Sequence, residues 1–184
     1  KHSFSPPTEE ITRYPADRKL ILVDSGEIKL SVASKNFQNA ITSLSKQDYD
    51  ICVIDSPGMF GTRLFSAMYA VQYVLAPIEV EAFSIDGIKD LLTNIKKARE
   101  QRGNVQLLGI VANKVDKRSP RQVQNINDLN QAYPGFLMPV MIGNRSSIPE
   151  SIAKKESIWR NQKTSASLAK KELAELSALA MQKM

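Results

Sequence analysis

The chain has 184 residues, of which 42% are hydrophobic and 24% are charged, a composition typical of a single globular domain. No apolar run approaches the roughly 20 residues that cross a bilayer, and the first residues show no secretory leader, so we expect a cytoplasmic protein without a membrane role. One cysteine, Cys52, excludes a disulfide within the chain. The net charge of +6 mildly favours a polyanionic partner.

Apolar runs bounded by turn residues predict strands, and apolar residues at helical spacing predict helices. Residues 1–15 carry three prolines and little periodicity, so we expect a loop or arm there. The predicted strands are 20–24, 51–55, 73–78, 107–112 and 136–141. The predicted helices are 35–46, 61–71, 85–99, 120–133 and 165–181. This alternation predicts an α/β fold, with a mostly parallel sheet covered by helices on both faces, in one domain over 1–184.

The chemistry of such a fold is expected where its strands end, because open α/β sheets bind ligands beyond the carboxyl ends of their strands. The run 51–55 delivers Asp55 to such an end and is followed by Ser56, Pro57 and Gly58. A carboxylate there can hold magnesium, directly or through water, while the ion bridges nucleotide phosphates. Cys52, inside the same run, is expected to be a small core residue.

A second predicted strand ends in Asn113-Lys114-Val115-Asp116, which has two functional interpretations. An Asn-Lys-x-Asp turn is the guanine-reading motif of GTPases, in which the aspartate accepts two hydrogen bonds from the base. In one class of ATPases an asparagine at this strand end contacts adenine instead. Both interpretations make Asn113 a base contact, and they differ on the role of Asp116.

The stretch from Tyr49 to Pro57 resembles the Walker B pattern Tyr-Asp-x-x-x-x-Asp-Thr/Ser-Pro of the ParA/MinD-type P-loop ATPases. The order that follows is also similar to that family: a helix, a strand ending near Pro77, and a polar turn before the helix at 85–99. The resemblance implies that Asp55 organises Mg²⁺ and is the catalytic residue, that 56–58 contact the γ-phosphate, and that the base is adenine.

The segment 138–153 resembles the late loop of the same family, with Pro139 in the part that packs beside the base. Arg145 aligns with an arginine that touches DNA non-specifically in the partition members. Basic residues gathered on one face would bind phosphates by releasing counterions. The predicted DNA contacts are Arg145, Lys117, Arg118, Lys154 and Lys155.

The family's Gly-rich loop ending in Gly-Lys-Thr/Ser, which cradles the phosphates, has no counterpart in these residues. Three explanations compete: a fragment of a longer chain, which we favour; a degenerate scaffold without turnover; or a strand supplied by another polypeptide. For the full-length parent the resemblance implies an ATPase of plasmid or chromosome partition. It would form a homodimer around ATP, bind DNA non-specifically at the nucleoid, and respond to a ParB-like activator. A GTPase using Asp55–Gly58 and Asn113–Asp116 is the alternative.

Overall fold

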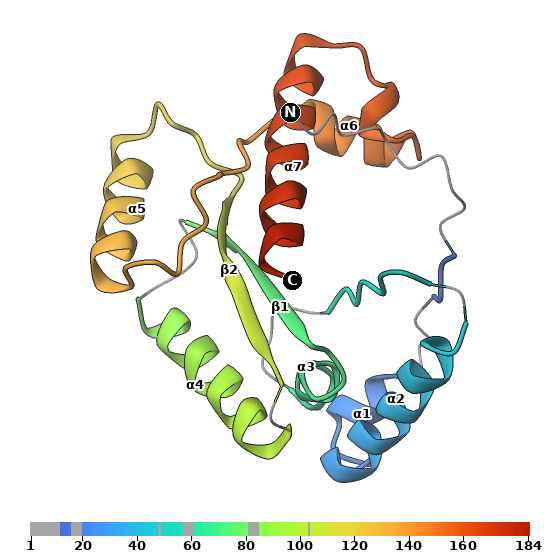
Figure 1. Ribbon diagram of the computed structural model, residues 1–184. Coiled ribbons are helices and arrows are strands. Elements are labelled where there is room, and N and C mark those ends of the chain that lie inside the picture. Colours follow the sequence, from blue (N-terminus) through green and yellow to red (C-terminus); the bar gives the residue numbers. More distant parts are fainter. Residues whose placement is uncertain (1–11, 16–19, 48, 57–60, 81–84, 103) are drawn as a thin grey trace. The chain divides into compact units, whose positions relative to one another are not determined.

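A computed structural model describes residues 12–15, 20–47, 49–56, 61–80, 85–102 and 104–184. They belong to two compact units. One contains Leu75–Leu91 and Leu107–Met184, and the other contains Ile11–Val74 and Leu92–Gln106. The predicted α/β class is confirmed, since the described chain contains two neighbouring parallel strands joined by a helix, with further helices before and after them (Figure 1).

The strands β1 (Tyr73–Glu79) and β2 (Gln106–Asn113) lie side by side and run in the same direction (Figure 1). β2 carries a continuous apolar run in which residues 108–112 are buried, as expected for a strand covered on both faces. Both strands were predicted within one or two residues of their observed ends.

The prediction of a strand at 136–141 is wrong. The described residues contain no continuous strand there, but two isolated parallel bridges connect residues 137 and 143 to β2 and the residues after it. The bridges pair Ile110 with Leu137 and Val115 with Gly143. Pro139 lies between them and has no N–H to donate to a ladder, which accounts for the interruption. The segment nevertheless follows β2 along its length and extends the parallel pairing.

Three α-helices follow β2 in the first unit. α5 (Pro120–Ala132) begins as predicted: Pro120 occupies the first turn, and the Ser119 side chain caps it by accepting from the Gln122 N–H at 3.4 Å. α6 (Ser147–Ala153) and the short 3₁₀ helix η2 (Ile158–Arg160) lead into α7 (Thr164–Lys183), which confirms the predicted closing helix.

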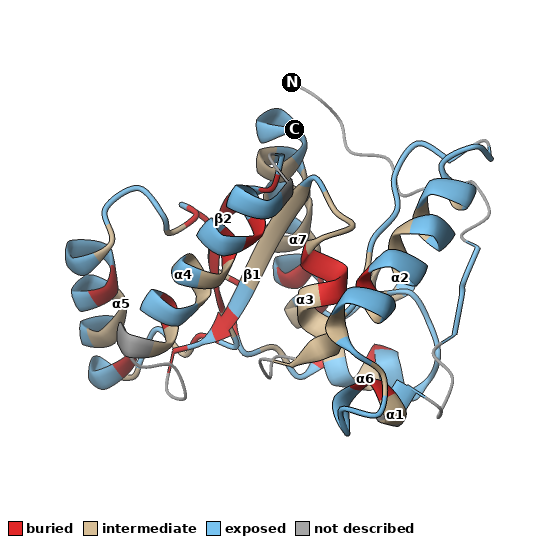
Figure 2. Cartoon of the chain, turned by 90° about the horizontal axis from the view of Figure 1, so that it is seen from below, coloured by how far each residue is buried: buried red, intermediate tan, exposed pale blue. Residues whose placement is uncertain are grey.

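The main core of this unit lies between β2, the 138–142 segment and α7. Val111, Met138, Val140 and Ile142 are buried together, and they are covered by partly buried residues, namely Leu75, Ile148, Leu173, Leu176 and Leu179. Figure 2 shows buried residues along β2 in red. Burying each such side chain fully contributes about 1.5–3 kcal/mol, so this cluster fixes the end of β2 in place.

The second unit contains α1 (Ile21–Asp24), α2 (Leu30–Leu44) and α3 (Thr62–Met68). Gln38 on α2 donates to the Tyr69 carbonyl at 2.7 Å, and the Ser34 and Ser66 hydroxyls lie 3.3 Å apart in the buried contact between α2 and α3. The helix α4 (Ile85–Arg102), predicted over 85–99, belongs partly to each unit and buries Ile88 and Ile95.

The prediction of a strand at 20–24 is wrong, because Ile21–Asp24 is one helical turn. A short apolar run cannot be assigned to strand or helix by its pattern alone. Asp24 forms an ion pair with Arg63 of α3, and its carboxylate accepts from the Arg63 N–H at 3.4 Å. This tertiary contact holds the turn against α3.

The prediction of a buried strand at 51–55 is also wrong for the described residues. They are not assigned to a strand, and the described part of the chain contains no strand paired with them. Ile51 is 46% exposed, Val53 is 87% exposed, and Cys52 is exposed rather than a core residue. Strand structure requires a hydrogen-bonded neighbour, which local sequence cannot supply.

Replacing Gly109 of β2 with alanine should destabilise the fold by about 1–3 kcal/mol, the usual cost of overpacking a core. A Cβ there would lie 2.5 Å from the Met138 sulfur and 3.3 Å from the Phe136 carbonyl oxygen. Urea denaturation of Gly109→Ala, Met138→Ala and the double variant measures the effect. The double variant should lose less stability than the sum of the single variants, and strict additivity would contradict the predicted clash.

Candidate functional site

The residues predicted to contact the base lie in the turn that follows β2. Three backbone hydrogen bonds tie this turn to the neighbouring segment: Ile142 N–H to the Ala112 carbonyl, Val115 N–H to the Ile142 carbonyl, and Asn144 N–H to the Val115 carbonyl, each at 2.9 Å. Lys114 adopts a positive φ of 54°, which is uncommon for a residue other than glycine. The surrounding pairing holds this conformation, a feature typical of functional turns.

The side chain of Asn113 begins this turn and is half-buried. Its carboxamide oxygen accepts the Lys114 N–H at 3.0 Å. The carboxamide NH₂ can donate to a ligand, and the oxygen keeps a second lone pair. This assignment fits the predicted role of a base contact, which stays a prediction.

Asp116 closes the turn, and its carboxylate is held by Arg118. Oδ1 accepts the Arg118 N–H and Nε–H, each at 3.0 Å, and Oδ2 accepts from Nη2 at 3.1 Å. These bonds, the side-chain ones first, lower the pKa of the Asp116 carboxyl. The backbone N–H of Asp116 donates to Gln122 of α5 at 2.8 Å, so the residue is fixed from both sides.

An ion pair joins the ends of the two strands next to this turn. Lys114 Nζ lies 2.5 Å from Glu79 Oε1, and both side chains are more than half exposed. An exposed pair of this kind adds little stability. It does place one cation and one carboxylate at the edge of the sheet where a ligand is expected.

Arg145 lies in the loop before α6 and is bound to Glu172 of α7. Arg145 Nη2 donates to Glu172 Oε1 at 2.6 Å, and the second oxygen, Oε2, accepts the Gly143 N–H at 3.0 Å. The two side chains are 27% and 16% exposed. A Cβ on Gly143 would lie 2.8 Å from Arg145 Nε, so the guanidinium covers Gly143 closely and a larger residue there would displace it.

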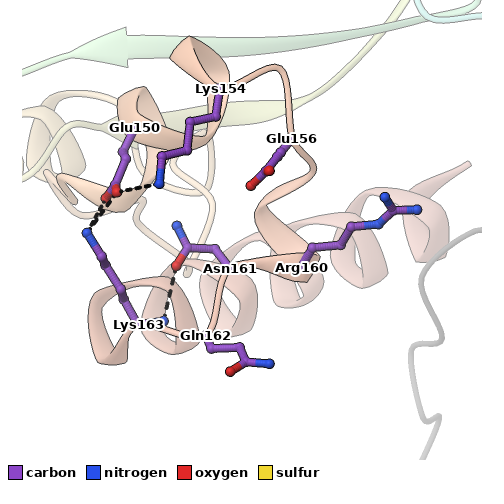
Figure 3. A pocket seen from close by; sticks show the side chains of 7 residues that line it. All are labelled: Glu150, Lys154, Glu156, Arg160, Asn161, Gln162 and Lys163. Atoms are coloured by element: carbon purple, nitrogen blue, oxygen red, sulfur yellow. Dashed lines mark hydrogen bonds and ion pairs between the residues drawn. The ribbon is translucent and has the colours of Figure 1, made fainter.

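The other residues predicted to contact DNA are exposed, but several of the surrounding charges are paired. Lys154 and Lys163 both bind Glu150, at 3.2 and 2.7 Å. Figure 3 shows these three side chains beside Glu156 and Arg160 around a hollow of about 440 Å³ at the α6–α7 corner. Lys117, Arg118 and Lys155 are exposed, and Pro139 is exposed beside the bridges to β2.

Asp55 and Ser56 lie in the second unit at the end of a stretch without regular secondary structure, where Asp55 is exposed and Ser56 is half-buried. Pro57 and Gly58 lie outside the described residues. The structure therefore places Asn113, Asp116, Pro139 and Arg145 in one unit and Asp55 in the other. Their predicted roles stay predictions.

Comparison with known proteins identifies the family. A family model described as an AAA domain matches residues 5–108, which is 104 of the 184 residues. The chain belongs to the ParA-type ATPase family. The predicted resemblance is confirmed by this match and by the similar proteins.

Among these relatives of the ParA-type chain is protein IncC of Escherichia coli, 38% identical over 164 residues, which cover 89% of this chain and 45% of IncC. The virulence plasmid ParA family protein pGP5-D of Chlamydia trachomatis is 27% identical, over 68% of this chain and 47% of its own. The sporulation initiation inhibitor protein Soj of Bacillus subtilis is 24% identical, over 58% and 42%. The chain thus spans about half the length of the curated relatives it matches.

Magnesium is the ion that nucleotide chemistry in this family implies. The described residues contain no group of three or more His, Cys, Asp and Glu side chains that could enclose a metal. Mg²⁺ is usually held by one or two carboxylates together with water and nucleotide phosphates. A single exposed carboxylate such as Asp55 fits that mode, in which the phosphates complete the coordination.

Within the part of the chain that the structure describes, no helix combines the length and apolar character needed to cross a membrane.

Glu172, which was not predicted from the sequence, binds the 143–145 loop through Gly143 and Arg145. Its position carried a signal: Glu172 lies three residues after the buried Ala169 and four before Leu176, on the helix face that packs inward. A carboxylate on such a face needs a partner, and here the partners are Gly143 and Arg145. The Glu79–Lys114 pair was missed because no local pattern joins residues 35 positions apart.

Glu172→Ala should lower the free energy of unfolding by about 1–3 kcal/mol, because it leaves the Gly143 N–H and the Arg145 guanidinium without their acceptor. Urea denaturation measures the loss. Glu175→Ala, at an exposed position of the same helix, is the matched control and should change little. Equal effects of the two variants would show that the bond to Arg145 contributes nothing.

Lys163 and then Lys154 lower the pKa of the Glu150 carboxyl through hydrogen bonds to its charged form. The stability gained is therefore present above the carboxyl's unfolded pKa and is lost as the pH falls through its lower, folded pKa. We expect Lys163→Ala to raise the pKa of Glu150 more than Lys154→Ala does, as measured by an NMR pH titration. Lys171→Ala, an exposed change on α7, should leave the titration unmoved, and the opposite order of the two lysines would contradict the structure.

Proposed function

We propose that the complete protein is a Mg²⁺-dependent ATPase that acts in the partition of plasmid or chromosomal DNA. It forms a homodimer around ATP, binds DNA non-specifically, and releases it after hydrolysis. A ParB-like partner stimulates the hydrolysis. The protein works in the cytoplasm on the nucleoid.

The observation that carries this proposal is the rigid turn after β2 in a ParA-type chain. Asn113 presents its NH₂ group there, and the residues on either side, Ala112 and Val115, pair with residues 142–144. A base contact must be held in one geometry to select its ligand, and backbone pairing on both sides does this without bound nucleotide. In this proposal Asp55 organises Mg²⁺ and residues 56–58 contact the γ-phosphate.

Non-specific DNA binding is supported by the net charge of +6 and by exposed cations near the turn and immediately after α6. In the proposed interface Lys117, Arg118, Lys154 and Lys155 contact phosphates. Arg145 can join them only by leaving Glu172, because its guanidinium is paired and largely covered. Its part in DNA binding is therefore conditional on that bond breaking.

Two other functions predict different measurements. A GTPase would bind GTP in preference to ATP through Asp116. A degenerate scaffold would bind DNA or a partner without any nucleotide turnover. ParA-type membership favours the ATPase over both, and nucleotide competition and phosphate release separate the three.

The protein expressed from its complete gene should be retained on non-specific DNA only when ATP and Mg²⁺ are present. Asp55→Ala should remove this dependence and stop phosphate release, because the metal loses its carboxylate. Filter or surface-plasmon measurements of DNA retention, with and without ATP, test both effects. Asp90→Ala, on an exposed part of α4, is the control for removing one carboxylate.

Retention that is indifferent to ATP, or to Asp55→Ala, would overturn the proposal. The binding should also weaken with salt in the way phosphate contacts require. If four cations neutralise phosphates, raising the salt from about 50 to 200 mM lowers the affinity roughly a hundredfold.

A further inference from the structure

We propose that Arg118 sets the base preference of this site by occupying the carboxylate of Asp116, so that the turn accepts adenine and rejects guanine. The inference rests on the proposed nucleotide-binding function and names the residue that decides which nucleotide is taken. The Asn113–Asp116 motif can be interpreted as binding guanine or adenine. The Asp116–Arg118 contact, which is not part of that motif, favours adenine.

The hydrogen-bonding capacity of Asp116 supports this role. A carboxylate offers about four lone-pair positions, two on each oxygen. Arg118 uses three of them: its N–H and Nε–H both bond Oδ1, and Nη2–H bonds Oδ2. Guanine recognition by an aspartate needs one acceptor position on each oxygen, for the ring N–H and the amino group. Only one position remains, on Oδ2, so guanine cannot form both bonds while Arg118 stays in place.

Backbone hydrogen bonds hold Asp116 in place, so its carboxylate cannot turn away from Arg118 to bind guanine. Its N–H is bonded to Gln122, and its carbonyl accepts the Ser119 N–H at 3.0 Å. Val115, the preceding residue, is paired with Ile142 and Asn144. The backbone bonds therefore keep the Asp116 carboxylate next to Arg118. There the planar guanidinium donates to both carboxylate oxygens, from Nε to Oδ1 and from Nη2 to Oδ2.

Asn113 is not affected by Arg118 and offers donors that adenine can use. Its oxygen accepts the Lys114 N–H, and its NH₂ group can donate to an acceptor nitrogen of the base. Adenine recognition at this turn therefore needs no contribution from the Asp116 carboxylate. Guanine recognition does need it, and this difference creates the preference.

The preference should be limited in size, since Arg118 is 91% exposed and an exposed ion pair is easily broken. Removing the guanidinium leaves only the backbone N–H of residue 118 on Oδ1. One position on Oδ1 and two on Oδ2 are then open, which is enough for both guanine bonds. Arg118→Lys should have an intermediate effect, because an ammonium cannot form the two-point fork.

The test uses the protein from its complete gene, a fluorescent ATP analogue as the bound probe, and displacement by unlabelled ATP or GTP. In the unaltered protein ATP should displace the probe at lower concentration than GTP. Arg118→Ala should narrow the ratio of the two affinities by about two- to fivefold, through tighter GTP binding, because GTP then no longer has to displace an exposed ion pair. Arg121→Ala removes the same charge from an exposed position on α5 and should leave the ratio unchanged.

A second variant tests whether the gain in GTP affinity comes from the Asp116 carboxylate. In the Arg118→Ala background, Asp116→Asn replaces one acceptor oxygen with a donor, and the gain in GTP affinity should disappear. An unchanged ratio in Arg118→Ala, or one altered only by weaker ATP binding, would overturn the inference. Failure of the unaltered protein to bind ATP at all would instead overturn the proposed function, so the two failures are distinguishable.

Discussion

The pairing of the 142–144 segment with the end of β2 is the constraint on which the candidate site depends. It sets the backbone of residues 113–116, including the positive φ of Lys114, and it brings Gly143 within reach of α7. The hydrophobic cluster that includes Val111 and Ile142 also stabilises the contact between β2 and the 142–144 segment. A change that separated these segments would therefore alter both the base-contacting turn and the loop of Arg145.

Charge pairing limits which basic residues are available to a partner. Glu172 holds Arg145, Glu150 holds Lys154 and Lys163, and Asp116 holds Arg118. The pairs differ in strength because they differ in burial. Arg145 and Glu172 are mostly covered, whereas Arg118 is almost fully exposed. A polyanion could compete easily for the exposed cations and only at a higher cost for Arg145.

The elements that could be predicted from sequence are those whose pattern is long or whose ends are marked. The helix at 120–133 has a serine cap and a proline in its first turn, and the strand at 107–112 is a continuous apolar run. The runs 20–24 and 51–55 carried the same apolar signal without these supports. One is a helical turn held by Arg63, and the other has no regular secondary structure and no paired strand in the described chain.

The sequence by itself determined the α/β class, the family and the positions of the candidate polar residues, because motifs and hydrophobic periods are local. Only the tertiary structure decided how those residues are used. The bonds of Glu172 to Gly143 and Arg145 join positions nearly 30 residues apart, and the pairing of Val115 with Gly143 sets the turn of Asn113. Even the Asp116–Arg118 contact, two residues apart, depends on a turn that this distant pairing holds. Side-chain partners follow from how the chain folds back on itself, which no local pattern encodes.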